Sequence, residues 1–181
     1  MSTDIGIIGL PNAGKSTLLS RLTMARPRID NYPFTTLFPN LGVMTSEDDR
    51  ALIIADIPGL IKGASLGRGL GHRFLKHIER TGLLLHIMDI TYLPGRDILE
   101  DFHTLNAEME AYNPGLMEKP QMALINKMDL YGPEHRDLEI LRKALQKIGL
   151  ECFEISALTG KGVDKLKRII FERWTEFREK S

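Results

Sequence analysis

The segment Gly9–Ser16, which reads Gly-Leu-Pro-Asn-Ala-Gly-Lys-Ser, is the feature that most constrains the fold of this chain. It matches the pattern G-x-x-x-x-G-K-[ST] and follows the apolar run Ile5–Ile8. The next residues place Leu18, Leu22 and Ala25 on one face of a helix. A strand, a glycine-rich loop and a helix in this order predict a phosphate-binding P-loop. The alternative is a glycine-rich turn that carries a solvated lysine.

The residue types in this loop suit a bound nucleotide. Gly9 and Gly14 let the backbone wrap a phosphate chain with its N–H groups pointing inward. Lys15 supplies a mobile charge for the β- and γ-phosphates, and the Ser16 hydroxyl is a hard ligand for Mg²⁺. We therefore expect nucleotide contacts from Gly9, Leu10, Pro11, Asn12, Ala13, Gly14, Lys15, Ser16 and Thr17.

The composition excludes several classes of protein. A length of 181 residues suits one domain, and 24 basic against 24 acidic residues exclude a bulk polycation, so we expect no sequence-specific DNA binding. A single cysteine, Cys152, excludes a disulfide framework and a cysteine zinc cluster, and it favours the cytoplasm. No apolar run approaches the roughly 20 residues of a membrane helix, so we expect no membrane contact.

Short apolar runs alternate with amphipathic stretches, which predicts an α/β fold with a mainly parallel sheet. His86, inside one of these runs, is most simply a hydrogen-bonded core residue, and Glu47–Asp49 predict a solvated hairpin turn. The predicted strands are Asp4–Gly9, Leu41–Thr45, Ala51–Asp56, Leu83–Asp89, Gln121–Asn126 and Cys152–Ile155.

Three apolar stripes at helical spacing predict helices that face the core. For Phe177 the alternative is a contact with a neighbouring domain. Two stretches, Arg26–Asn40 and Ile57–Gly71, fit no regular element, and loops of that length are usually functional. The stripes are Ile98, Phe102, Leu105 and Met109; Leu138, Leu141, Leu145 and Ile148; and Val163, Leu166, Ile170, Trp174 and Phe177.

A second phosphate-side motif, Asp56-Ile57-Pro58-Gly59, ends the apolar strand that contains Leu52–Ala55. A carboxylate at this place in a P-loop protein holds the metal, usually through water. Gly59 could bring its N–H close to a γ-phosphate without obstruction by a side chain. By itself the motif also fits a plain exit from a strand into a turn.

The motif Asn126-Lys127-Met128-Asp129 follows another apolar strand and predicts a base-binding end of the site. An ionised Asp129 accepts two hydrogen bonds from a planar donor pair, which guanine offers at N1–H and its exocyclic amine and adenine does not. Such a site rejects adenine strongly, because the carboxylate then loses its partners.

Other residues near this motif complete the predicted base contacts. Asn126 can tie its loop back to the P-loop and contact the base, and the stem of Lys127 can lie across the ring. Met128 lies between Lys127 and Asp129 in this motif. After the last strand, Ser156-Ala157-Leu158 could present the N–H of Ala157 to the guanine oxygen.

Together these motifs resemble the GTP-binding domain of a translation-factor-class GTPase, and in detail the Obg family, also called CgtA. Tyr32–Gly42 resembles that family's first switch, and Asp56–Leu60, Gly69–His72 and His77–Thr81 resemble its second switch and the following helix. The similarity covers essentially the whole chain.

The resemblance has implications for fold and site. It implies a six-stranded sheet with one antiparallel strand, Leu41–Thr45, and helices on both faces. It places Phe34, Thr35 and Thr36 at the nucleotide, with Thr36 closing on Mg²⁺ and the γ-phosphate in the GTP-bound form. Obg proteins carry further domains, so we expect a single G domain, residues 1–181, excised from a longer protein.

Leu60 bears on the mechanism of hydrolysis, because many GTPases place a water-orienting glutamine at this position. Leucine cannot orient water, so hydrolysis is slow or depends on other groups. Related GTPases with an apolar residue here use a bound potassium ion, for which Asn12 would supply a side-chain oxygen. The alternative role for Asn12 is that of a capping or turn residue.

We therefore predict a Mg²⁺-dependent GTP-binding switch with slow GTP hydrolysis, in which Lys15, Thr36, Gly59 and Asn12 have catalytic roles. By resemblance the whole protein acts on ribosomal particles in large-subunit assembly or stress signalling, with ppGpp as a possible ligand, and this domain is a monomer. Two alternatives stay open: a nucleotide-sensing module with incidental hydrolysis, and an ATP-using P-loop enzyme.

Overall fold

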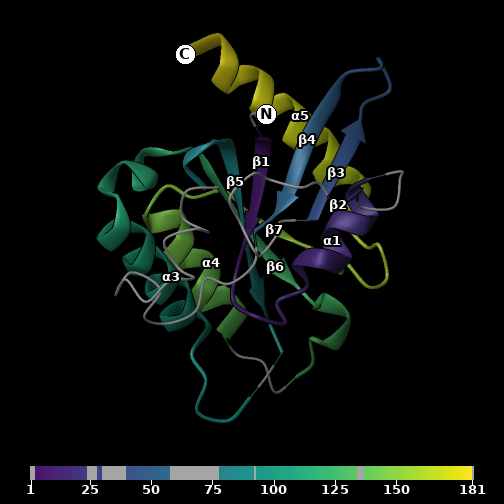
Figure 1. Cartoon of the computed structure of the whole chain (residues 1–181). Coiled ribbons are helices and arrows are strands. Elements are labelled where there is room, and N and C mark those ends of the chain that lie inside the picture. Colours follow the sequence, from purple (N-terminus) through teal and green to yellow (C-terminus); the bar gives the residue numbers. More distant parts are fainter. Residues whose placement is uncertain are drawn as a thin grey trace.

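The computed structural model describes residues 3–23, 28–29, 40–57, 78–91, 93–133 and 137–180. These residues form one seven-stranded sheet with helices on both faces (Figure 1). The strands are β1 (Thr3–Ile8), β2 (Arg28–Ile29), β3 (Asn40–Thr45), β4 (Ala51–Asp56), β5 (Thr81–Asp89), β6 (Gln121–Asn126) and β7 (Cys152–Glu154). The helices are α1 (Lys15–Leu22), α3 (Ile98–Tyr112), α4 (Asp137–Lys147) and α5 (Val163–Lys180), with short 3₁₀ helices η2 (Pro114–Glu118) and η3 (Met128–Leu130).

The strand order is β2-β3-β4-β1-β5-β6-β7. Strand β1 pairs in parallel with β4 and β5, and the parallel pairing continues through β6 to β7. Strand β3 runs antiparallel to both of its neighbours. The predicted α/β fold with one antiparallel strand is therefore confirmed, and all six predicted strands are present with ends that shift by at most two residues.

The seventh strand, β2, lies inside Arg26–Asn40, which the sequence predicts to be irregular. It pairs with β3 at two residues only, Arg28 with Leu41 and Ile29 with Asn40. Two residues are too few to show an alternating apolar pattern, so periodicity does not reveal such a strand.

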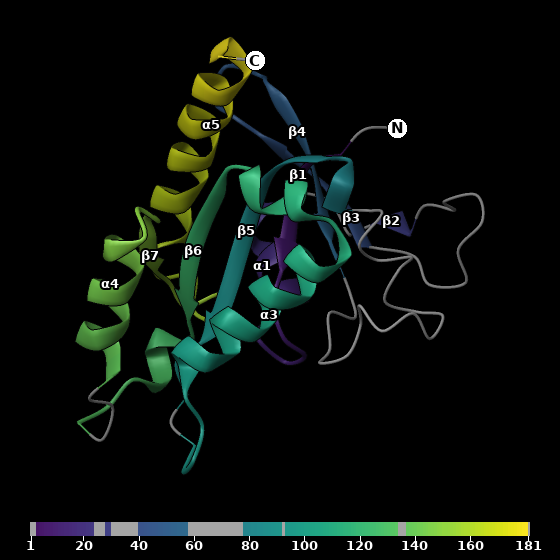
Figure 2. The same cartoon turned by 90° about the vertical axis from the view of Figure 1, so that its left-hand side faces the viewer.

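The helices form two layers, with α1 and α5 on one side of the sheet and α3 and α4 on the other. Figure 2, turned by 90°, shows α3 in front of the strands. Helices α1 and α5 pack their apolar residues against β1, β4, β5 and β6 in one cluster. Trp174 and Phe177 are partly buried against that cluster, so the predicted core-facing stripe of α5 is confirmed over its whole length.

The prediction that Ile148 packs in the core is wrong. Helix α4 ends at Lys147, and Ile148 is 57 % exposed. Gly149 has a φ of 75°, and the N–H of Leu150 donates to the carbonyl of Leu145. This glycine turn ends the helix, and Leu150, not Ile148, packs against the core. Ala25, which the sequence predicts to lie on the first helix, is outside the described residues.

The turn between β3 and β4 lies at the end of the sheet opposite to the carboxyl ends of the parallel strands (Figure 1). The N–H of Ser46 donates to the carbonyl of Arg50 at 2.9 Å, and Asp49 has a φ of 58°. Glu47, Asp48 and Asp49 are exposed, so the predicted solvated hairpin turn is confirmed.

His86 lies in the middle of β5 and is 2 % exposed, as predicted for a core histidine. Its ring stacks on Phe102 of α3 with the ring centres 4.7 Å apart. Its Nδ1 has no hydrogen-bond partner within the part of the chain that the structure describes. Burial lowers the pKa of His86 to about 3, so this side chain is neutral in the folded protein at neutral pH.

The buried His86 predicts that the protein loses stability as the pH falls. Below about pH 6.5 the unfolded chain binds a proton at this residue and the folded chain does not, so the free energy of unfolding falls with decreasing pH by up to about 1.4 kcal/mol per unit. Unfolding in urea at pH 7.5, 6.5 and 5.5 measures this slope. His86→Leu removes part of it, whereas the exposed control His103→Leu keeps it. Equal slopes for both variants would contradict the assignment.

Candidate nucleotide-binding site

The motifs of the predicted site, as far as the structure describes them, lie at one edge of the sheet. The P-loop follows β1, Asp56 ends β4, Asn126 ends β6, and Ser156 lies just beyond β7. Because these strands are parallel, their carboxyl ends meet at the same edge, where α/β proteins bind their ligands (Figure 1). The structure therefore brings the phosphate motif and the base motif together.

The P-loop packs closely on its neighbours, which explains its two glycines. Gly14 has a φ of 101°, and a Cβ there would collide with the side-chain nitrogen of Asn126. A Cβ on Gly9 would lie 2.6 Å from the carbonyl oxygen of Ile87 in β5. Helix α1 begins directly after this loop at Lys15, and no side chain caps its first turn. Its N–H groups can therefore meet an anion.

Lys15 curls over the loop, and its ammonium donates to the carbonyl oxygens of Gly9 and Leu10 at 3.2 Å each. Burial lowers the pKa of Lys15, and the charge of Asp56 opposes that shift. The position suits a cation that moves between carbonyl oxygens and phosphate oxygens.

Ser16 and Asp56 fit a divalent cation. The hydroxyl of Ser16 donates to Oδ2 of Asp56 at 2.7 Å. Asp56 is only 4 % exposed, and its Oδ1 is buried without a hydrogen-bond partner among the described residues. A buried carboxylate oxygen without a partner is costly, and a hydroxyl beside a carboxylate is a donor set that Mg²⁺ accepts.

Asn126 joins the two halves of the site. Its side chain is 2 % exposed, and its Nδ2 donates to the carbonyl of Ala13 in the P-loop at 2.8 Å. Its Oδ1 accepts from the backbone N–H of Ala157 at 2.9 Å. One amide therefore bridges the P-loop and the turn after β7, residues 156–160, which we name the base loop.

Asp129 is held from the base loop. The hydroxyl of Ser156 donates to Oδ1 of Asp129 at 2.5 Å, and the N–H of Thr159 donates to the same hydroxyl at 3.1 Å. Asp129 is exposed, so its carboxylate is accessible to a planar donor pair. Ser156 itself is fully buried and supports Asp129.

The N–H of Ala157, predicted to meet a guanine oxygen, donates to Asn126 in this structure. The next backbone donor in the base loop is the N–H of Leu158, for which the described residues offer no acceptor. Both donors lie in the same turn, and the contact with the base stays a prediction.

Asp89 is a site residue that the sequence reasoning missed. Lys127 has a φ of 67°, and its ammonium donates to Oδ2 of Asp89 at 2.7 Å. The N–H of Thr91 donates to Oδ1 at 2.8 Å, and Arg96 lies 3.8 Å from Oδ2. Burial acts to raise the pKa of Asp89, but these hydrogen bonds and the charge of Lys127 outweigh it and hold the pKa below its usual value. An acid at the end of a strand, as at Asp56, is the signal that could have found it.

Several predicted site residues have other surroundings or lie outside the described residues. Ile57 is fully buried, and its N–H donates to the carbonyl of Ile7, so its side chain belongs to the core. Asn12 is exposed and has a φ of 65°, which marks a turn, whereas Met128 packs beside the core. Pro11, Thr17 and Leu158 are exposed at the site edge. Phe34, Thr35, Thr36, Pro58, Gly59 and Leu60 lie outside the described residues.

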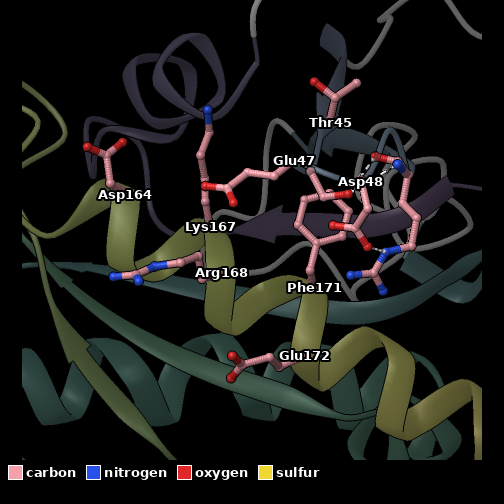
Figure 3. Close-up of a pocket in the computed structure, with 10 residues that line it drawn as sticks. Thr45, Glu47, Asp48, Asp164, Lys167, Arg168, Phe171 and Glu172 are labelled. Atoms are coloured by element: carbon pink, nitrogen blue, oxygen red, sulfur yellow. Dashed lines mark hydrogen bonds and ion pairs between the residues drawn. The ribbon is translucent and has the colours of Figure 1, made fainter.

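A hollow of about 570 Å³ lies away from this site, between the β3–β4 turn and α5 (Figure 3). Its walls carry charges of both signs, including Glu47, Asp48, Lys167 and Arg168. None of its lining residues belongs to the phosphate or base motifs, so it is separate from the predicted site. Over the described ranges no group of three or more His, Cys, Asp or Glu residues could hold a metal ion, and no helix could cross a bilayer.

Comparison with known families agrees with this geometry. The pattern of the family described as 50S ribosome-binding GTPase matches residues 4–127, more than half of the chain. The chain belongs to this family. Membership confirms the predicted GTP-binding P-loop domain of a GTPase.

Individual Obg proteins match this chain over nearly its whole length. The GTPase Obg of Alkaliphilus oremlandii is 51 % identical over 176 residues, which are 97 % of this chain and 41 % of that protein. The GTPase Obg of Aquifex aeolicus is 49 % identical over 177 residues, which are 98 % of this chain and 51 % of that protein. The chain spans about half the length of these relatives, or less.

Solved structures share the fold. Era of Aquifex aeolicus bound to GDP and AlF4⁻ has a TM-score of 0.68 at 28 % identity, over 95 % of this chain and 57 % of that one. The nucleolar GTP-binding protein 1 of Plasmodium falciparum has a TM-score of 0.76 at 22 % identity, over 99 % of this chain and 89 % of that one. At that identity the second comparison shows the fold alone.

The bridge through Asn126 predicts a joint loss of stability and affinity. In Asn126→Ala the carbonyl of Ala13 and the N–H of Ala157 lose their partners in a buried place, which costs about 1–3 kcal/mol each. We expect the free energy of unfolding to fall by about 2–6 kcal/mol and GDP to bind more weakly. Chemical unfolding and GDP titration measure the two effects.

Asn113→Ala is the matched control for this experiment. The side chain of Asn113 also makes two hydrogen bonds, to Glu79 and to the N–H of Gly115, but it is partly exposed and far from the P-loop in the chain. This control loses some stability and keeps its affinity for GDP. If Asn126→Ala binds GDP as tightly as the control, the bridge has no role in binding.

Proposed function

We propose that this domain is a Mg²⁺-dependent GTP-binding switch that hydrolyses GTP slowly. The observation that carries the proposal is the Asn126 side chain, which links a phosphate-binding loop to a loop that also holds Asp129. A P-loop alone fits any nucleoside triphosphate, whereas a held carboxylate next to it selects a base with a donor pair. Guanine has that pair.

The phosphate end supports hydrolysis through charge. Lys15 would exchange the carbonyls of Gly9 and Leu10 for β- and γ-phosphate oxygens, and the first N–H groups of α1 would face the same anion. Mg²⁺, when bound, supplies positive charge that offsets the negative charge on the transferred phosphoryl group. Ser16 would hold it directly, and Asp56 through water. Thr36 and Gly59 are proposed to close on the γ-phosphate, as the resemblance to Obg implies.

A ribosomal partner would respond to the nucleotide bound at this site. The family description names the 50S ribosome, and Era has been solved with MgGDPNP and a fragment of 16S ribosomal RNA. We therefore propose that the whole protein, of which this chain is a G domain, acts on ribosomal particles in the cytoplasm, in subunit assembly or stress signalling. Binding of ppGpp in place of GDP and a monomeric state of this domain belong to the same proposal.

Competition between nucleotides tests the guanine preference. Fluorescent GDP bound to the chain with Mg²⁺ is displaced by unlabelled GDP, and ADP is weaker by at least about a thousandfold, because adenine offers no pair of donors to Asp129. Displacement by ADP at a concentration similar to that of GDP would favour the alternative of an ATP-using P-loop enzyme and contradict the proposal.

Hydrolysis in potassium and in sodium at equal ionic strength tests the catalytic part. Leu60 cannot orient water, so we expect potassium to increase the rate several-fold through a cation held partly by Asn12. Asn12→Ala loses this increase and keeps its affinity for GDP. Steady-state release of phosphate measures the rates.

Equal and very slow rates in both salts would contradict the potassium proposal. A nucleotide-sensing module with incidental hydrolysis would then be the better description, unless ribosomal particles raise the rate.

A further inference from the structure

Arg21 is a charged residue of α1 that the predicted site does not use. It lies in the last turn of the helix that follows the P-loop. Its Nε donates to the carbonyl of Ala157 at 3.0 Å, and its Nη2 donates to the carbonyl of Leu158 at 2.5 Å. These are consecutive carbonyls of the base loop. Gly160 has a φ of 87°, and a Cβ added there would lie 3.5 Å from the guanidinium. The backbone of the base loop therefore runs beside Arg21 without a clash.

This contact is not the ordinary role of an arginine at the end of a helix. Such a residue commonly binds the last carbonyls of its own helix. Here the guanidinium fork reaches two carbonyls that lie 136 and 137 residues further along the chain. Two donors in a fixed plane set the orientation of both acceptors, which a single point charge does not do.

The geometry of the peptide unit gives this contact a consequence. The described backbone contains no cis peptide bond. In a trans peptide the N–H points opposite to the C=O, so the N–H of Leu158 points away from the Ala157 carbonyl that Arg21 holds. The N–H of Ala157, one peptide earlier, donates to Asn126. The orientations of the N–H groups of Leu158 and Ala157 are therefore set by Arg21 and by Asn126, respectively.

A ring of contacts results. The P-loop leads into α1, whose Arg21 holds the carbonyl of Ala157. The N–H of Ala157 bonds Asn126, and Asn126 bonds Ala13 of the P-loop. Asp129 stands outside this ring, because Ser156 holds it through a separate hydrogen bond.

Building on the proposed guanine site, we propose that Arg21 is a positioning residue for recognition of the oxygen at position 6 of guanine. It acts through the Ala157–Leu158 peptide, whose N–H donor it orients. Asp129, which Ser156 holds in place, reads the N1–H and the exocyclic amine separately. Loss of Arg21 therefore weakens one half of base recognition and leaves the other half intact.

Three nucleotides distinguish recognition of the oxygen at position 6 from recognition of the exocyclic amine in a binding assay. GDP carries all base groups, 6-thio-GDP replaces the oxygen by sulfur, a weaker acceptor, and inosine diphosphate lacks the exocyclic amine. The wild-type chain prefers GDP over both analogues. In Arg21→Gln the affinity for GDP falls about tenfold, and the preference over 6-thio-GDP largely disappears, whereas the preference over inosine diphosphate stays.

Arg168→Gln is the matched control, since Arg168 is an exposed arginine of α5 with no hydrogen bond or ion pair among the described residues. It behaves as the wild type in all three titrations. Arg21→Lys keeps a charged donor group without the planar fork and recovers part of the preference, and it replaces Arg21→Gln if that variant does not fold. Thermal melting of each variant reports folding.

The outcomes separate this inference from the proposed function. If the variants at Arg21 keep the wild-type preference over 6-thio-GDP, or lose both preferences equally, Arg21 has no such positioning role. If the wild-type chain itself binds GDP no better than ADP, the proposed function fails and the inference fails with it.

Discussion

The side chain of Asn126 is the contact on which the site depends. A primary amide offers both a donor and an acceptor, and here each is used once in a buried place, toward Ala13 and toward Ala157. The phosphate loop and the base loop come from opposite ends of the chain, yet this one residue fixes the distance between them. The same contact requires glycine at position 14, because any side chain on Gly14 would collide with the Asn126 amide.

Three aspartates at this edge of the sheet have different hydrogen-bond partners and therefore suit different roles. Asp56 ends β4 and bonds Ser16, which leaves a buried oxygen suited to a metal. Asp89 ends β5 and holds Lys127, so its charge is used within the protein. Asp129 follows β6 and is held by Ser156, with its carboxylate accessible. In the proposed site, burial and hydrogen bonding, and not residue type alone, assign Asp56 to the metal, Asp89 to Lys127 and Asp129 to the base.

Much of the fold follows from local patterns. Apolar runs predict β1, β4, β5 and β6, because strands buried on both faces are nearly continuous in apolar residues. The P-loop follows from its glycines and Lys15. Ile148 was misplaced because it continues the helical spacing, whereas Gly149 turns the chain and brings Leu150 into the core. The short β2 was missed because its pairing with β3 is a tertiary contact.

The site was predictable where a motif carries the chemistry and not where distant residues support it. Asn126 was expected to reach the P-loop, and it does. Arg21 has no distinguishing pattern in the sequence, since an arginine in the last turn of a helix is common and its partners lie far along the chain. Asp89 resembles Asp56 in its position at a strand end, but its role is visible only from the ammonium beside it.

A crystal structure of this chain with Mg²⁺ and GDP is the measurement that tests the account most directly. We expect the phosphates to lie on the N–H groups of the P-loop and the guanine to lie between Asp129 and the base loop. The hydrogen bonds from Asn126 to Ala13 and Ala157 should be retained in that complex. A base bound elsewhere, or a nucleotide complex in which both of these hydrogen bonds are broken, would contradict the claim that one buried amide builds the site.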